Sequence, residues 1–141
     1  MAGAGVQKQL AMRFPARADR LKGVRARVLE AAHGCGCGDG AARDAVLAVD
    51  EACQNIIRHA YRGESDGEIV LEIWREGTEM VIQLRDFAQT VAPETIRPRD
   101  LDDVRPGGLG THLMREVMDR VDFLPPPARR GNLLRMVKRI A

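Results

Sequence analysis

The fold of this chain is decided by residues 69–85, which read IVLEIWREGTEMVIQLR. Apolar side chains alternate with other residues in two runs, which are separated by a short turn containing Gly77. Such a pattern predicts a β-hairpin with one buried face. Strands joined by a hairpin pair antiparallel, which excludes a doubly wound parallel sheet. The buried face would carry Ile69, Leu71, Ile73, Met80, Ile82 and Leu84.

The rest of the chain adds three helices and three further strands around this hairpin. The spacing of apolar residues predicts helices over 16–33, 41–61 and 109–118, and strands over 6–14, 121–124 and 133–140. The Gly-rich stretch 34–40 separates the first two helices, and Asp39 is a plausible N-cap of the second. The order β-α-α-β-β-α-β-β predicts a single α+β domain over residues 1–141. It would be a two-layer sandwich, with a mixed, mostly antiparallel sheet and helices on one face.

Composition limits the class of protein. The 141 residues are 45% hydrophobic and 30% charged, as in a soluble globular domain, and the formal net charge is only +2. A nucleic-acid partner usually requires a concentrated basic face, which this sequence does not show. There is no apolar run long enough to span a bilayer and no signal-peptide pattern at the N-terminus. We therefore expect a cytoplasmic protein with neither nucleic acid nor membrane as partner.

The cysteines favour a reduced protein. Their number, three, is odd, which argues against a disulfide framework. His33, Cys35 and Cys37 lie close together and raise the alternative of a zinc site. A structural zinc site needs four ligands and usually has two residues between paired cysteines. A flexible Gly-rich loop is therefore the favoured interpretation.

Three polar features stand at the ends of predicted elements. Glu51 and Asn55 are four residues apart and share one helix face, where a carboxylate could act as a base and an amide oxygen could bind Mg²⁺. Asp86 ends a hydrophobic strand and could accept a hydrogen bond from an exocyclic amine. The glycine-rich turn 105–110 precedes a helix and could approach an anion. Taken singly, these features could equally be a solvated helix face, a strand terminator and a plain loop.

Taken together and in order, they resemble the nucleotide-binding pattern of the GHKL (histidine kinase-like) ATPase superfamily. The resemblance is closest to the anti-sigma-factor serine/threonine kinases. It is carried by the N box AVDEACQNIIRHAY at 48–61, the adenine-binding segment DFAQTVAP at 86–93, the glycine box GGLG at 107–110 and the final strand GNLLRMVKR at 131–139.

The resemblance implies a site for ATP and Mg²⁺. Asn55 would ligate the metal, Glu51 would be the catalytic carboxylate, and Asp86 would bind the adenine amino group. Ala88 stands where the family usually has glycine, so its methyl group would lie near the adenine. The phosphates would be held by the glycine box, with a further contact to the terminal phosphate: Gly107, Gly108, Leu109, Gly110 and Arg105.

The resemblance also implies a function. The chain would be an ATP-binding anti-sigma factor with serine kinase activity on an anti-anti-sigma (STAS-type) partner, would bind a sigma factor, and would form a homodimer. Ala88 motivates an alternative, a non-catalytic, nucleotide-responsive protein-binding module that regulates transcription. A structural domain without a ligand is the third possibility. Asn132 stands where many relatives have threonine and still offers a polar contact.

Overall fold

The computed structural model describes residues 7–88 and 109–140, with the backbone alone at 109–111 and 129. The element order agrees with the prediction. The strands are β1 (Lys8–Pro15), β2 (Glu68–Glu76), β3 (Glu79–Asp86), β4 (Arg120–Leu124) and β5 (Asn132–Arg139). The α-helices are α2 (Leu21–Gly34), α3 (Asp39–Asn55) and α5 (Leu109–Val117), and short helical turns lie at Ala18–Arg20, Ile56–Ala60 and Pro127–Arg129.

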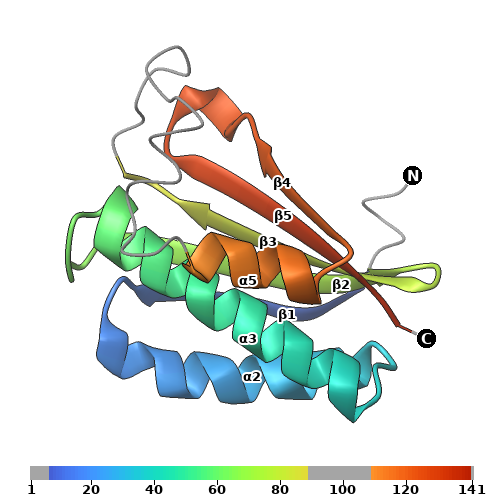
Figure 1. Cartoon of the computed structure of the whole chain (residues 1–141). Helices are drawn as coiled ribbons and strands as arrows, with labels where there is room; N and C mark the ends of the chain where they lie inside the picture. The colour runs from blue at the N-terminus through green and yellow to red at the C-terminus, as the bar shows by residue number, and fades with distance from the viewer. Residues whose placement is uncertain (1–6, 89–108, 141) are drawn as a thin grey trace.

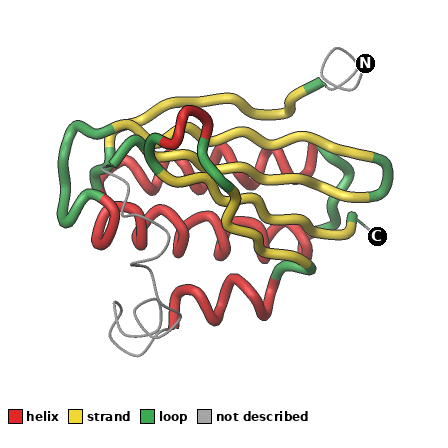
Figure 2. Tube along the Cα trace, turned by 90° about the horizontal axis from the view of Figure 1, so that it is seen from above, coloured by secondary structure: helices red, strands yellow, loops and turns green. Residues whose placement is uncertain are grey.

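The five described strands form one sheet in the order β1-β2-β3-β5-β4. Each neighbouring pair is antiparallel, so the parallel pairing that a mixed sheet would include does not occur among the described strands. The three α-helices cover one face of this sheet (Figures 1 and 2). The predicted α+β two-layer sandwich is confirmed, and β1 is an edge strand.

The hairpin alternation builds the core. Ile69, Leu71, Ile73, Ile82 and Leu84 are at most 1% exposed and face the helices. Leu71 lies opposite Leu84, and Ile73 lies opposite Ile82, in the β2–β3 ladder. Full burial of such a side chain contributes about 1.5–3 kcal/mol. The hairpin therefore provides the floor on which the helix layer packs.

The first helix begins later than predicted, at Leu21 rather than residue 16. The backbone of Ala16 is already used elsewhere: its N–H donates to the carbonyl of Gly67 at 2.8 Å, and its carbonyl accepts from the N–H of Ser65 at 3.0 Å. A residue paired on both sides in this way cannot start an α-helix. Long-range pairing therefore overrides the local helical pattern here.

The junction between α2 and α3 also differs from the prediction. Gly38, with extended backbone, occupies the N-cap position, and Asp39 is the first helical residue, so the N-cap prediction for Asp39 is wrong. A carboxylate in the first turn still interacts favourably with the helix dipole. Instead of a flexible loop, the connection places Cys35 and Cys37 in the core at 1% and 6% exposure.

The second predicted helix changes character at its end. After Asn55 the turn Ile56–Ala60 is a π-helix, and the N–H of Tyr61 donates to the carbonyl of Ile56 at 2.9 Å. Short π-helical insertions are frequent at functional sites.

In the described part of the chain, no helix is long and apolar enough to cross a membrane.

Candidate functional site

One flank of α3 is occupied by structural contacts. Asp50 accepts hydrogen bonds from Arg25 of α2 at 2.8 Å and from Gln54 at 2.7 Å. The contact with Arg25 links α3 to α2, and the contact with Gln54 lies within α3.

Glu51 and Asn55 lie on another flank of the same helix and are half-buried. Among the described residues, neither side chain has a hydrogen-bond or ion-pair partner. Neither residue has a buried, unsatisfied polar atom, so the carboxylate and the amide are open to solvent and available to a ligand.

The start of α5 lies level with the last turns of α3. Lys138 Nζ lies 3.0 Å from a carboxylate oxygen of Asp44 in α3 and 2.6 Å from the carbonyl oxygen of Val117 at the end of α5. The two helices pack together and run in opposite directions (Figure 1). At 1.5 Å per residue, α5 extends about 12 Å back from Val117, and Glu51 lies about 10 Å along α3 from Asp44. The N-terminus of α5 is thus placed beside the Glu51–Asn55 flank.

The glycine box is only partly described. Leu109 and Gly110 form the first turn of α5, whereas Arg105, Gly107 and Gly108 lie outside the described residues. A helix N-terminus at this position favours an anion such as a phosphate.

Asp86 ends β3 and is 2% exposed, the one buried charged side chain in the described part of the chain. Its Oδ1 accepts hydrogen bonds from the N–H of Ala88 and from Asn132 Nδ2, both at 3.0 Å, and Asn132 Nδ2 lies 3.3 Å from Oδ2. Burial raises the pKa of Asp86, whereas these hydrogen bonds act in the opposite direction by stabilising the carboxylate. Ala88 is itself buried, at 5% exposure.

Gly131 brings Asn132 to this carboxylate. Its φ is +82°, and a Cβ at this position would overlap the backbone carbonyl of Asp86. The close approach of β5 to the end of β3 therefore requires glycine. Both residues belong to the segment 131–139 that was predicted as the final strand, and their contact with Asp86 was not predicted. A Gly-Asn pair directly before an apolar strand was the available signal.

The elements that carry the described site residues have the relevant ends on one side of the molecule. The C-terminal end of α3, the end of β3 and the start of α5 lie at the same end in two perpendicular views (Figures 1 and 2). A cavity of about 240 Å³ is a different feature, lined by Arg13, Gln83, Arg85 and Phe87 among others. Because side chains alternate along a strand, Arg85 points to the helix-free face of the sheet, opposite Asp86.

Comparisons with known proteins show the family of this chain. A family model described as the histidine kinase-like ATPase domain matches residues 14–138. The chain is 29% identical over 126 residues to the serine-protein kinase RsbW of Listeria monocytogenes, covering 84% of this chain and 80% of that protein. It is 30% identical over 122 residues to RsbW of Bacillus pumilus, covering 79% and 75%. The chain therefore belongs to the histidine kinase-like ATPase domain family.

The narrower resemblance to the anti-sigma-factor serine kinases is also confirmed, by the similarity to these RsbW proteins. A crystal structure of the RsbU and RsbW domains of a Mycobacterium tuberculosis protein matches with a TM-score of 0.63 over 93% of this chain, at 16% identity. The present chain spans 32% of that longer chain, and this likeness shows the fold alone.

Proposed function

We propose that this protein is an ATP- and Mg²⁺-dependent serine kinase that phosphorylates an anti-anti-sigma (STAS-type) protein and binds a sigma factor. The observation that carries the proposal is the flank of α3 on which Glu51 and Asn55 have no partner among the described residues. That flank lies beside the start of α5 and at the same end of the molecule as buried Asp86. The similarity to serine-protein kinases over most of the chain supports the same activity.

The residues present fit a magnesium–nucleotide. The buried carboxylate of Asp86 has acceptor capacity beyond its two present donors and would receive the adenine amino group. Asn55 would offer its amide oxygen, a ligand type that Mg²⁺ accepts. The turn 105–110 would hold the phosphates at the N-terminus of α5, with Arg105 on the terminal phosphate.

Phosphoryl transfer depends on positioning and charge neutralisation more than on covalent chemistry by the protein. Mg²⁺, when bound, would neutralise charge on the phosphates. Glu51 would orient the substrate serine hydroxyl and accept its proton as the serine oxygen attacks the terminal phosphorus. The bond between that phosphorus and the oxygen bridging to ADP breaks in the same step, so the products are phosphoserine and ADP.

The test is transfer of label from [γ-³²P]ATP, with Mg²⁺, to an anti-anti-sigma (STAS-type) protein of the same organism. Wild type should label the partner, and Glu51→Gln should reduce transfer by about 10²-fold or more, the usual contribution of a positioned base. Glu30→Gln, on exposed surface of α2, is the matched control and should retain the wild-type rate. Absence of transfer by a wild-type protein that binds both ATP and the partner would exclude the kinase activity.

A non-catalytic module is the second candidate, and Ala88 favours it. The Ala88 side chain is 5% exposed where the family usually has glycine, so its methyl group would crowd the adenine. Calorimetry with ATP and ADP separates the two functions, because sub-millimolar binding without turnover would support the module. Ala88→Gly should then tighten ATP binding.

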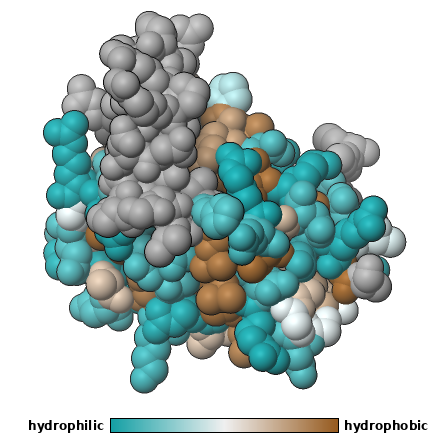
Figure 3. Space-filling view, in the orientation of Figure 1, coloured by the Kyte–Doolittle hydropathy of each residue, from teal (hydrophilic) through white to brown (hydrophobic). Residues whose placement is uncertain are grey.

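Partner binding is the remaining part of the proposal. Figure 3 shows hydrophobic surface near the centre of the helix-covered face, among hydrophilic side chains. Leu29 of α2 and Leu47 of α3 are 43% and 44% exposed.

The proposal also includes a location and an assembly. The protein would act in the cytoplasm, where it would meet a sigma factor, and it would form a homodimer. Analytical ultracentrifugation, alone and with the partners, tests both assemblies.

A further inference from the structure

Tyr61 connects two parts of the candidate site: the end of α3, which carries Asn55, and the end of β3, which carries Asp86. It follows the π-helix Ile56–Ala60, and its hydroxyl lies 2.8 Å from two backbone atoms. The hydroxyl accepts a hydrogen bond from the N–H of Phe87 and donates one to the carbonyl oxygen of Glu68. A tyrosine hydroxyl is protonated at neutral pH and able to donate, and burial raises the pKa of Tyr61 further.

The hydroxyl occupies the end of a β-ladder. The last pair in the β2–β3 register is Ile69 opposite Asp86, so Glu68 and Phe87 would form the next pair. Instead of bonding to each other, they are bridged by Tyr61. An oxygen inserted between two strands keeps their ends apart without leaving either backbone group unsatisfied.

The bridge determines where the chain goes after Asp86. With Phe87 held by Tyr61, the chain leaves the ladder, and the N–H of Ala88 turns back to Oδ1 of Asp86 at 3.0 Å. This local hydrogen bond and the one from Asn132 orient the carboxylate. The orientation of the Asp86 carboxylate, the proposed adenine acceptor, therefore depends on the Tyr61 hydroxyl, which binds the next residue, Phe87.

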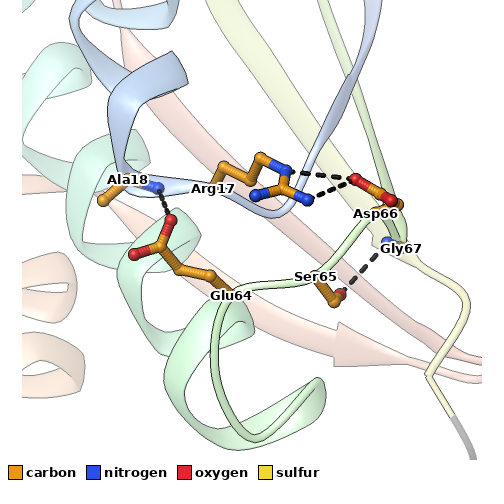
Figure 4. A network of polar contacts seen from close by, with 6 residues as sticks. All are labelled: Arg17, Ala18, Glu64, Ser65, Asp66 and Gly67. Carbon is orange, nitrogen blue, oxygen red and sulfur yellow. Dashed lines mark hydrogen bonds and ion pairs between the residues drawn. The ribbon is translucent and has the colours of Figure 1, made fainter.

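The aromatic ring has a rigid support. A Cβ on Gly67 would overlap Tyr61 Cε1, so the ring lies directly on the Gly67 backbone. Gly67 is the last residue of the loop that precedes β2. Figure 4 shows the contacts between this loop and the chain after β1: Arg17 donates to Asp66 at 2.7 and 3.1 Å, and Glu64 accepts from the N–H of Ala18 at 3.2 Å.

From this geometry we infer that Tyr61 is a positioning residue for nucleobase recognition. Its hydroxyl separates the ends of β2 and β3 so that the Asp86–Ala88 segment presents its carboxylate to adenine. The inference rests on the proposed function, because it assumes that adenine binds at Asp86. Tyr61 would then link the chain that follows α3, the helix bearing Asn55, to Asp86, the proposed base-binding residue.

Tyr61→Phe is the direct test, because it removes only the hydroxyl and keeps the ring. Without nucleotide, amide hydrogen exchange at Phe87 and Ala88 should become faster. Calorimetry should then show ATP binding weakened by about 2- to 10-fold, the range for one neutral hydrogen bond. Binding of inorganic tripolyphosphate, which has no base, should stay within twofold of wild type. A general loss of structure would weaken both ligands together.

Ser65→Ala is the matched control. Ser65 Oγ accepts a hydrogen bond from the N–H of Gly67 at 3.1 Å in the same loop (Figure 4). The N–H of Phe87 donates to Tyr61 and not to Ser65. This variant should leave the ratio of ATP to tripolyphosphate affinity unchanged. Gly67→Ala is a second probe, because the added methyl must displace the Tyr61 ring, and it should lower that ratio as Tyr61→Phe does.

The outcomes separate the two proposals. A wild-type protein that binds ATP no better than tripolyphosphate would overturn base recognition at Asp86, and this inference with it. If wild type prefers ATP and Tyr61→Phe keeps the same preference, the positioning role of Tyr61 alone is overturned. An equal loss of preference in Ser65→Ala would also overturn it, because the effect would then belong to the loop in general.

Discussion

At the scale of single residues, Asp86 combines two properties that rarely occur together. Its side chain is 2% exposed, yet its hydrogen-bond partners are an amide N–H and a neutral side-chain amide rather than a cation. A buried carboxylate without an ion-pair partner lowers stability, and such groups are frequent at functional sites. Asn132 supplies a donor directly to this carboxylate.

Asp86→Asn should weaken ATP binding by about 10- to 100-fold, because a hydrogen bond to a charged acceptor contributes about 1.5–3 kcal/mol. Isothermal calorimetry measures the change. Asp122→Asn is the matched control, since Asp122 is exposed in β4 beside Arg120. Equal affinity of Asp86→Asn and wild type would contradict the assignment of Asp86 to the adenine.

Asp86 should make the free energy of unfolding depend on pH. Its folded-state pKa is raised, chiefly by burial, so its contribution to stability is fully present below the unfolded-state pKa of about 3.9. That contribution is lost as the pH rises through the folded-state pKa. The free energy of unfolding of wild type, relative to Asp86→Asn, should therefore fall from pH 4 towards neutral pH. Urea denaturation at several pH values measures this difference, and a rise over that range would contradict it.

At the scale of elements, the junction of β3 and β5 depends on one glycine. Gly131 has φ of +82°, and its Cα faces the backbone of Asp86 without room for a methyl group. The π-helix Ile56–Ala60 is a second local departure, because it carries Tyr61 to the end of the β2–β3 ladder. Both features lie next to the candidate site.

Gly131→Ala should lower the free energy of unfolding by about 3 kcal/mol, through backbone strain and overlap with Asp86. Gly23→Ala is the matched control, because Gly23 lies in α2 with open space around it. Alanine there should stabilise the helix by up to about 1 kcal/mol. Chemical denaturation of both variants tests the pair, and similar effects of the two substitutions would contradict the requirement for glycine at 131.

At the scale of the whole molecule, one core joins the sheet to the helix layer. Ile82 of the central strand β3 is 0% exposed, whereas Leu29 on the outside of α2 is 43% exposed. Ile82→Ala should destabilise the protein by about 2–5 kcal/mol, and Leu29→Ala by about 1 kcal/mol or less. Thermal and urea unfolding should remain one cooperative transition in both variants. Separate transitions of sheet and helices would contradict a single core.

Much of this protein follows from local pattern. The period-2 alternation of residues 69–85 predicted the hairpin and its buried face, because opposite faces of a strand meet different environments. The order of elements, and the placement of Glu51, Asn55 and Asp86 at element ends, were predicted on the same basis. Short-range periodicity and turn signals depend only on residues that are close in the sequence, so they can be identified before any long-range contact is known.

What only the tertiary structure decided depends on residues far apart in the chain. Ala16 is excluded from its helix by Gly67, Gly131 is required by the backbone of Asp86, and Tyr61 bridges Glu68 to Phe87. No local preference encodes these contacts, because each arises when the sheet brings separate segments within hydrogen-bonding or van der Waals distance. The residues proposed for chemical roles could thus be named from the sequence, whereas the contacts around them were identified only from the packed fold.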